Sequence, residues 1–316
     1  MTLWLTLAVI LTIIGVLPFA IEALRPKMND TRRADASGQF ANLKQGITHY
    51  VLSGPVDGLL VVCIHGLTTP CFVWDKISKG LARPGYRVLI YDLYGRGFSD
   101  RPKSLQDQAF FDQQLLELLA YLELEEPFDL IGYSMGGAVA TGFAAKHLHR
   151  VRSLALLASA GTGLVEAPML KFIRDGRIFG AWLMLVAYPA QLRRGIQAER
   201  ALPTVDTHVS DAQEAQLTYS GFIPAVRSSL RGVLYRPLAD AHQVFHKVNI
   251  PMLAIWGGQD EVIPMQARQQ LAAWNSDVRD HIIENAGHGL PYTHSDEVLA
   301  LLTGFLARSA PQKRAE

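Results

Sequence analysis

The segment that most constrains the fold is residues 129–142, where an apolar run ends abruptly at Gly132-Tyr133-Ser134-Met135-Gly136-Gly137. This pattern predicts a strand that turns sharply into a helix and holds a serine at the turn. Gly132 and Gly136 are expected where a Cβ would collide with the neighbouring strand or helix. The turn would present the Ser134 hydroxyl above the sheet and aim the Met135 amide at whatever that hydroxyl attacks. Because Gly-x-Ser-x-Gly is common, an ordinary glycine-rich turn stays open at this point.

Short apolar runs alternate with helical patterns over most of the chain. Residues 59–64 and 86–91 are continuous apolar runs typical of strands buried on both faces. Further strands are expected as two short segments within residues 39–52, and at 128–131, 153–158, 251–256 and 279–283. Strands that alternate with helices in this way predict an α/β fold, with a mostly parallel sheet of about eight strands and helices on both faces.

The alternation stops between residues 161 and 248, which carry helical apolar clusters and no clear strand. This stretch is too long for a simple crossover, so we expect an inserted helical cap at 161–248 above the carboxyl edge of the sheet. The core would then comprise residues 39–160 and 249–308, with a tail at 309–316. Four apolar cap residues could line a substrate groove, although packing onto the body is the expected role of each: Met169, Trp182, Met184 and Tyr188.

The N-terminus is strongly apolar, since residues 3–20 carry no charged side chain. A helix needs about 20 apolar residues to cross a bilayer core, so this segment is just long enough. A buried core helix is disfavoured because the segment has no polar face. A cleaved signal peptide is an alternative, but no Lys or Arg precedes the apolar run. We therefore expect an uncleaved membrane anchor at residues 1–24 and a polar linker at 25–38.

Basic residues follow the expected anchor at Arg25, Lys27, Arg32 and Arg33. By the positive-inside rule they place the rest of the chain in the cytoplasm. Export after signal cleavage is the alternative localisation. The formal net charge of +1 and the lack of a basic run give no reason to expect nucleic acid as a partner.

Histidine and cysteine usage predicts no metal site, and no cofactor is expected. Cys63 and Cys71 are the two cysteines and make no disulfide framework. His242 and His246 are four residues apart, but no third ligand is apparent, so a polar helix face is expected. His49 is expected on the surface of a strand. The sequence does not predict the oligomeric state.

A serine hydroxyl needs a base to become a nucleophile, and the base needs a group that fixes its tautomer. In an open α/β fold such groups converge in the loops that follow the strands. Asp260 and His288 each lie in a glycine-containing loop just after a predicted strand. They follow Ser134 in the order Ser, Asp, His, which suits a nucleophile on a strand–helix turn. Glu261 is the alternative to Asp260 as the acid.

Acyl transfer also needs two hydrogen-bond donors aimed where negative charge develops. The Met135 amide is expected to supply one of them. The second donor is expected in the loop that follows the strand at residues 59–64, where the Leu67 amide is the candidate. His65 is expected to orient this loop and not to act as the base.

Taken together, these motifs resemble those of the alpha/beta-hydrolase superfamily over roughly residues 39–306. His65-Gly66 resembles the family's oxyanion loop, and the segment Asp-Leu-Tyr-Gly-Arg-Gly-Phe-Ser-Asp at 92–100 is similar to its D-x-x-G-x-G-x-S turn. Residues 257–260 resemble its acid turn, and Gly287-His288 its base loop. The resemblance implies an alpha/beta-hydrolase fold with Ser134 as the nucleophile.

The serine at the turn implies acyl transfer, since the epoxide-hydrolase and haloalkane-dehalogenase branches carry aspartate there. The chain is most similar to cap-bearing esterases and monoacylglycerol lipases. This implies a serine hydrolase that cleaves hydrophobic or lipidic carboxylic esters. Two alternatives stay open: a carbon–carbon bond hydrolase with the same triad, and a non-catalytic ligand-binding member of the fold.

Overall fold

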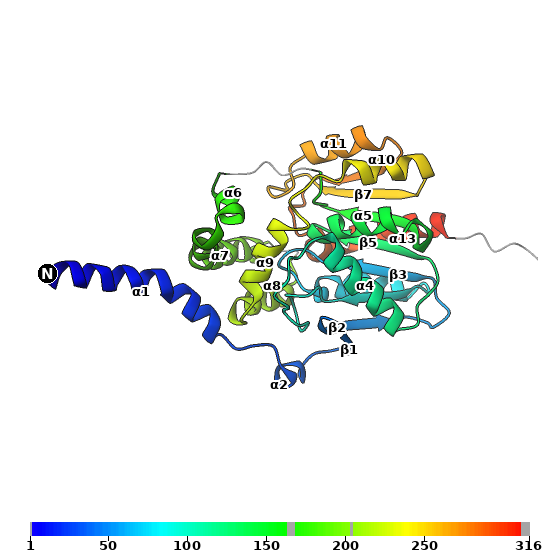
Figure 1. The fold of residues 1–316 in the computed structure, drawn as a ribbon. Helices are drawn as coiled ribbons and strands as arrows, with labels where there is room; N and C mark the ends of the chain where they lie inside the picture. The colour runs from blue at the N-terminus through cyan, green and yellow to red at the C-terminus, as the bar shows by residue number, and fades with distance from the viewer. Residues whose placement is uncertain (1, 163–167, 203–204, 311–316) are drawn as a thin grey trace, which may run out of the picture.

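The computed structural model describes residues 2–162, 168–202 and 205–310, and it contains an eight-stranded sheet of order β1-β2-β4-β3-β5-β6-β7-β8 (Figure 1). The strands are β1 Gln39–Leu43, β2 Gly46–Ser53, β3 Leu60–Ile64, β4 Arg87–Tyr91, β5 Phe128–Tyr133, β6 Val151–Leu157, β7 Met252–Gly257 and β8 Arg279–Ile283. The β1–β2 and β2–β4 pairs are antiparallel, and the other pairs are parallel. The predicted mostly parallel sheet is therefore confirmed.

Strand β3 shows why a central strand can be an unbroken apolar run. Val62 and Ile64 belong to the hydrophobic core on one face of the sheet, and Val61 and Cys63 to the core on the other. Successive side chains of a strand point to opposite faces, so a strand covered on both sides is buried at nearly every position and favours apolar residues.

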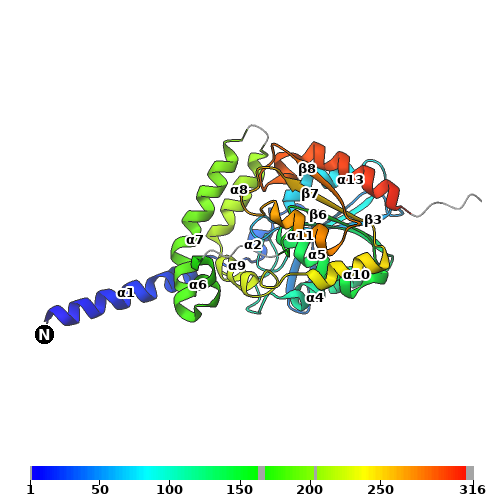
Figure 2. The ribbon, with the colours of Figure 1, turned by 90° about the horizontal axis from the view of Figure 1, so that it is seen from above.

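Helices cover both faces of the sheet, as Figure 2 shows with α13 on one side and α5 and α10 on the other. The helices that pack on the first core are α4 Gln108–Tyr121, α5 Met135–Lys146, α10 Ala239–Val248 and α11 Gln266–Trp274. Those on the second core are α3 Asp75–Ala82 and α13 Ser295–Ser309. Shorter helical turns lie at Cys71–Trp74, Leu148–Arg150, Gln216–Thr218 and α12 Leu290–Thr293.

After β6 the chain forms a group of helices to one side of the sheet (Figure 1). They are α6 Pro168–Asp175, α7 Arg177–Arg200, α8 Thr207–Ala215 and α9 Phe222–Arg231. Buried side chains of α6, α7 and α9 form a third core of their own, which includes Met184 and Phe222 and against which Tyr188 packs. Met184 and Tyr188 therefore serve packing, whereas Met169 is exposed. Helix α10 falls within the predicted cap range of 161–248 but packs against α5 and α11. The cap boundary at residue 248 therefore stays a prediction.

Helix α1 (Thr2–Leu24) projects from the body with most of its apolar side chains exposed (Figure 1). Within the described ranges it is the helix long and apolar enough to cross a membrane. It packs against α7, where Trp182 Nε1 donates to the Ile14 carbonyl oxygen at 2.9 Å. The predicted linker contains a short helix, α2 Asp30–Arg33, and residues 311–316 of the predicted tail lie outside the described residues.

His242 is buried on α10, so the predicted polar helix face is wrong for this residue. Its ring stacks on Trp274 of α11 with 5.9 Å between the centroids. Burial lowers the pKa of His242 to about 4, and its Nδ1 has no hydrogen-bond partner among the described residues. His246, one turn later, is exposed, with its Nδ1 2.6 Å from Asp277 Oδ2. The position of α11 thus decides which of the two histidines is covered.

We expect the fold to lose stability as the pH falls from about 6.5 towards about 4, because the unfolded chain binds a proton on His242 that the folded chain excludes. The substitution His242→Phe keeps an aromatic ring against Trp274 and removes this titration. It should reduce the acid-induced loss by roughly 1–3 kcal/mol, measured by urea unfolding at about pH 7 and about pH 4.5. His246→Asn is the control, and an undiminished loss in His242→Phe would contradict the prediction.

Candidate active site

Ser134 occupies the turn between β5 and α5 with a φ of 52° and a ψ of −119°. Such a backbone costs a non-glycine residue about 1–3 kcal/mol and persists only where its surroundings enforce it. The Ser134 amide donates to the Leu157 carbonyl at 2.9 Å, and the Ser134 carbonyl accepts from the amides of Gly137 and Ala160 at 2.9 and 3.0 Å. The neighbouring strand β6 and the first turn of α5 therefore hold the serine in this conformation.

Gly132 and Gly136 are glycines for a steric reason, as predicted. A Cβ on Gly132 would lie 2.5 Å from the Gly136 carbonyl oxygen and 2.6 Å from the Gly137 Cα. A Cβ on Gly136 would collide with the carbonyl oxygens of Ile64 and His65 at the end of β3. Helix α5 therefore approaches the sheet more closely than a side chain at either position would permit, and this closeness places Ser134.

Three predicted residues come together from three separate loops. Ser134 Oγ lies 2.9 Å from His288 Nε2, and His288 Nδ1 lies 2.8 Å from Asp260 Oδ2. The Asp260 side chain is 2% exposed. Its Oδ1 accepts hydrogen bonds from the amides of Val262 and Ile263, so the carboxylate cannot rotate away from the imidazole. The arrangement can take a proton from the Ser134 hydroxyl and stabilise the resulting imidazolium.

Glu261, the alternative acid, is exposed and has no ion-pair partner within residues 205–310 or elsewhere in the described chain. The structure brings Asp260 to His288 and leaves Glu261 in solvent.

The two predicted oxyanion donors, the amides of Leu67 and Met135, have no acceptor among the described residues. Both N–H groups are therefore available to a ligand. Met135 is the first residue of α5, where the positive end of the helix dipole favours negative charge. The Leu67 side chain packs against both the main core and the core of the cap, so this loop is in contact with the cap.

His65 holds the loop that carries Leu67. Its Nδ1 donates to the Gly66 carbonyl at 2.8 Å, and its Nε2 accepts from the Leu93 amide at 2.9 Å. The ring is completely buried, and burial lowers the pKa of His65 to about 4. The imidazole is therefore neutral and fully engaged by the backbone, in keeping with a structural role.

Arg96 is a residue whose importance sequence reasoning missed. Its guanidinium is completely buried, and burial lowers its pKa to about 9. Nε donates to the Leu67 carbonyl at 3.0 Å, Nη1 donates to the Tyr94 carbonyl and to Gln106 Oε1, and Nη2 donates to Ser229 Oγ of α9 at 2.8 Å. One side chain thus ties the Leu67 loop to the cap. The available signal was a long cation between two glycines in the turn at residues 95–97.

A cap residue also reaches the surroundings of His288. Glu199 of α7 accepts a hydrogen bond from Tyr292 Oη at 2.8 Å. The Tyr133 ring lies beside the imidazole of His288, with 5.4 Å between centroids. Burial raises the pKa of Glu199. The cap therefore contacts both the Leu67 loop, through Arg96, and the segment after His288, through Tyr292.

The atoms that could ligate a metal in His49, Cys71 and Asp92 lie within 4.8 Å of one another. The predicted surface position of His49 is wrong, because all three residues are buried. His49 Nδ1 lies 2.7 Å from one Asp92 oxygen, and the Cys71 amide donates to the other at 2.8 Å. His49 Nε2 is 2.7 Å from the Ser37 carbonyl. These hydrogen bonds account for the ring nitrogens and both carboxylate oxygens, so we assign a structural role to the group.

Comparison with known proteins adds a family and relatives with more than one activity. The sequence profile described as "alpha/beta hydrolase fold" matches residues 60–295. The 2-hydroxymuconate semialdehyde hydrolase of Pseudomonas sp. (strain CF600) is 28% identical over 80% of this chain and 88% of its own. Monoacylglycerol lipase ABHD6 of Bos taurus is 25% identical over 78% of this chain and 75% of its own.

A solved structure shares the fold over almost the whole chain. A membrane phospholipase A, described as a novel bacterial virulence factor, has a TM-score of 0.71 at 22% identity. The match covers 98% of this chain and 97% of the other. It therefore extends into the N-terminal helix as well as the domain that carries Ser134.

We expect Arg96→Met to destabilise the fold, because it leaves the Leu67 carbonyl and the buried Ser229 hydroxyl oxygen without their Arg96 donor and removes one of the two donors to Gln106 Oε1. Buried groups that lose a partner cost about 1–3 kcal/mol each, so a loss of at least about 2 kcal/mol should appear in denaturant unfolding. Arg83→Met removes the same charge from an exposed position and should stay within about 0.5 kcal/mol of the parent. Equal stability of the two variants would show that the Arg96 bonds contribute little.

Proposed function

We propose that this chain, which belongs to the alpha/beta hydrolase fold family, is a serine hydrolase. Its proposed substrates are carboxylic esters of a hydrophobic or lipidic compound. The observation that carries the proposal is the hydrogen-bonded series Ser134–His288–Asp260, with distances of 2.9 and 2.8 Å. A serine next to a base, and a base oriented by a buried carboxylate, is the arrangement that nucleophilic acyl transfer needs.

In the proposed reaction His288 Nε2 accepts the Ser134 proton while Ser134 Oγ attacks the ester carbonyl carbon. Asp260 holds the imidazole with Nδ1 protonated and stabilises the imidazolium. The amides of Leu67 and Met135 donate to the oxyanion. His288 then protonates the departing alcohol, which leaves an acyl-enzyme. A water that gives its proton to His288 attacks the acyl carbon, and collapse of the second intermediate releases the acid and restores Ser134.

The lipidic substrate class is supported by the position of the domain beside an apolar helix. Helix α1 has 23 residues, which at about 1.5 Å each span the roughly 30 Å of a bilayer core. Leu3 and Leu24, near its two ends, are 78% and 84% exposed. Exposed apolar surface of this extent is stable in lipid and costly in water. We propose that α1 is an uncleaved anchor. The relatives named as a monoacylglycerol lipase and a membrane phospholipase A agree with a lipidic substrate.

A carbon–carbon bond hydrolase is the second candidate, because the first relative above is named as a semialdehyde hydrolase. A polar acid as substrate would favour a cation near Ser134. Three arginines of α7, Arg177, Arg193 and Arg194, are exposed. The buried Arg96 already donates to neutral protein oxygens. Both facts favour the ester, and a panel of acyl esters against dienoic keto acids discriminates the two.

Replacement of the nucleophile gives the direct test of the mechanism. We expect Ser134→Ala to lower kcat for a p-nitrophenyl ester by about 10⁴-fold or more, and to abolish labelling by a fluorophosphonate probe. Probe labelling that persists in the folded variant would show that another residue is the nucleophile. Turnover of keto acids by the parent enzyme, without turnover of esters, would favour the second candidate.

The matched pair Asp260→Asn and Glu261→Gln serves as the control for the acid, because each removes one carboxylate charge at adjacent positions. Asp260→Asn should lower kcat by about 10³–10⁴-fold through loss of the imidazolium's partner. Glu261→Gln should leave kcat within about twofold, because its side chain is in solvent. The reverse result would exchange the two assignments.

The proposed anchor places the catalytic domain in the cytoplasm, because the basic residues lie on its C-terminal side. We expect protease to digest the domain in inside-out vesicles and to spare it in sealed right-side-out vesicles. Detergent should make both preparations sensitive. Digestion from the outside of intact right-side-out vesicles would establish the opposite orientation, and a shortened N-terminus in the mature chain would identify a signal peptide.

A further inference from the structure

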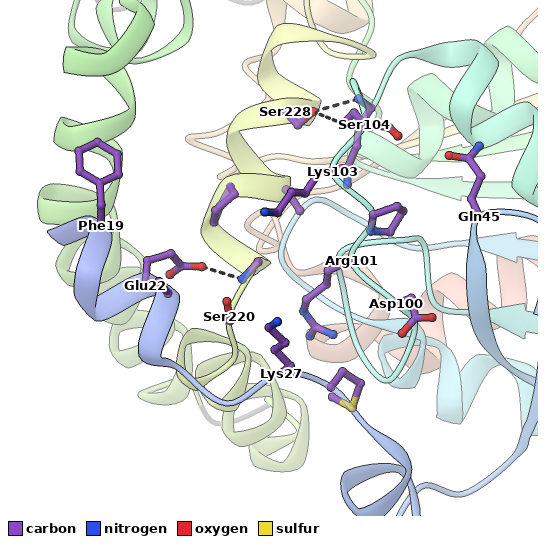
Figure 3. Close-up of a pocket in the computed structure, with 17 residues that line it drawn as sticks. Phe19, Glu22, Lys27, Gln45, Asp100, Arg101, Lys103, Ser104, Ser220 and Ser228 are labelled. Carbon is purple, nitrogen blue, oxygen red and sulfur yellow. Dashed lines mark hydrogen bonds between the residues drawn. The ribbon is translucent and has the colours of Figure 1, made fainter. Parts of the chain in front are cut away.

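A cavity of about 680 Å³ lies where α1 ends, between the following linker, the loop after β4 and helix α9 (Figure 3). It is separate from the active site, since neither Ser134 nor His288 lines it. Three cationic side chains do line it: Lys27 from the linker, and Arg101 and Lys103 from the loop. Figure 3 shows these side chains extending into the space between the linker and α9.

The acids of this cavity already have partners. Glu22 lies 2.6 Å from Arg25 and also accepts from the Gly221 amide at 2.6 Å. Asp100 lies 2.5 Å from Arg33. Neither Arg25 nor Arg33 lines the cavity. The lining therefore holds three cations against two acids, and each acid is also bound to a further arginine outside the lining.

None of the three cations forms an ion pair within the described residues, and Asp92 and Asp100 act on Arg101 only at longer range, where they raise its pKa. Arg101 donates to the carbonyls of Ser99 and Gly97 and to the Gln216 side-chain oxygen, all of which are neutral. Its Nε is buried and has no acceptor among the described residues. A buried donor without an acceptor is costly, and a guanidinium N–H is well suited to a phosphate oxygen. Burial lowers the pKa of Arg101 only to about 10, so it stays charged at neutral pH.

The position of the cavity along α1 identifies the kind of anion. Phe19 and Ala23, near the end of the apolar helix, line one side, and Lys27 lies three residues after the helix ends. If α1 spans the bilayer as proposed above, this is the level at which the hydrocarbon gives way to headgroups. An anion held here can therefore carry acyl chains that continue along the exposed face of α1.

We propose that this cavity binds the phosphate of an anionic phospholipid headgroup through Lys27, Arg101 and Lys103. The two exposed lysines and the guanidinium of Arg101 supply the positive charge. The assignment rests on the proposed anchoring of α1. It concerns a lipid that stays bound beside the anchor and not the ester that is hydrolysed at Ser134.

The test uses the full-length chain with Ser134→Ala in neutral detergent micelles, so that lipid turnover does not contribute. Native mass spectrometry measures binding of phosphatidylglycerol and of phosphatidylcholine. We expect a preference for phosphatidylglycerol. The pair Lys27→Gln and Lys103→Gln should weaken that binding by about 30-fold, since each basic residue near a lipid surface contributes about 1 kcal/mol. Binding of phosphatidylcholine should not change.

The control pair Lys79→Gln and Lys247→Gln removes two exposed charges far from the cavity lining and should keep the preference. Equal losses in the two pairs, or no preference in the parent chain, would overturn the proposal. Inorganic phosphate that displaces phosphatidylglycerol at equal concentration would make this a site for free phosphate, which also overturns it. Because the measurement needs no turnover, inactivity towards esters would not affect it. Alkaline extraction of membranes tests the anchoring separately.

Discussion

The close approach of α5 to strands β3 and β5 is the constraint on which the site depends. Gly132 and Gly136 remove the side chains that would hold the helix away from the sheet. The chain can then reverse direction within one residue, and Ser134 takes the positive φ that this reversal requires. The same approach places the amide of Met135, the first residue of the helix, beside the hydroxyl. Nucleophile and oxyanion donor are thus consequences of one steric requirement.

Much of the fold was predictable because its signals are local. A strand covered on both faces is apolar at most positions, so β3 and the last four residues of β4 stand out as apolar runs. The residues proposed for catalysis were also predictable, because the loops after parallel strands meet at one edge of the sheet. What local pattern could not decide was the choice between neighbours. Asp260 and Glu261 are adjacent carboxylates, and the conformation of the turn decides that Asp260 is the one beside His288.

The residues that sequence reasoning missed are those whose surroundings come from distant segments. His242 is covered by Trp274 and His49 by the turn that contains Asp92, and neither neighbour is indicated by the histidine's own flanks. Arg96 is the strongest case. A charged residue in a glycine-rich turn suggests a solvent-exposed loop, but carbonyls and side chains from several elements enclose it. Burial of polar groups depends on such long-range partners, which the sequence does not place.

The attachment of α1 has a mechanical consequence. Apart from the bond to the adjoining Arg25, its hydrogen bonds to the rest of the described chain run to Trp182 of α7 and to the start of α9, and both of these helices belong to the group beside the sheet. A helix that spans a bilayer tilts to match its apolar length to the local thickness. If α1 spans a bilayer as proposed, such a tilt would act first on α7 and α9, and Ser229 of α9 bonds to the arginine that holds the Leu67 loop. A change in membrane thickness would then act on this domain through the contacts that α1 makes with α7 and α9.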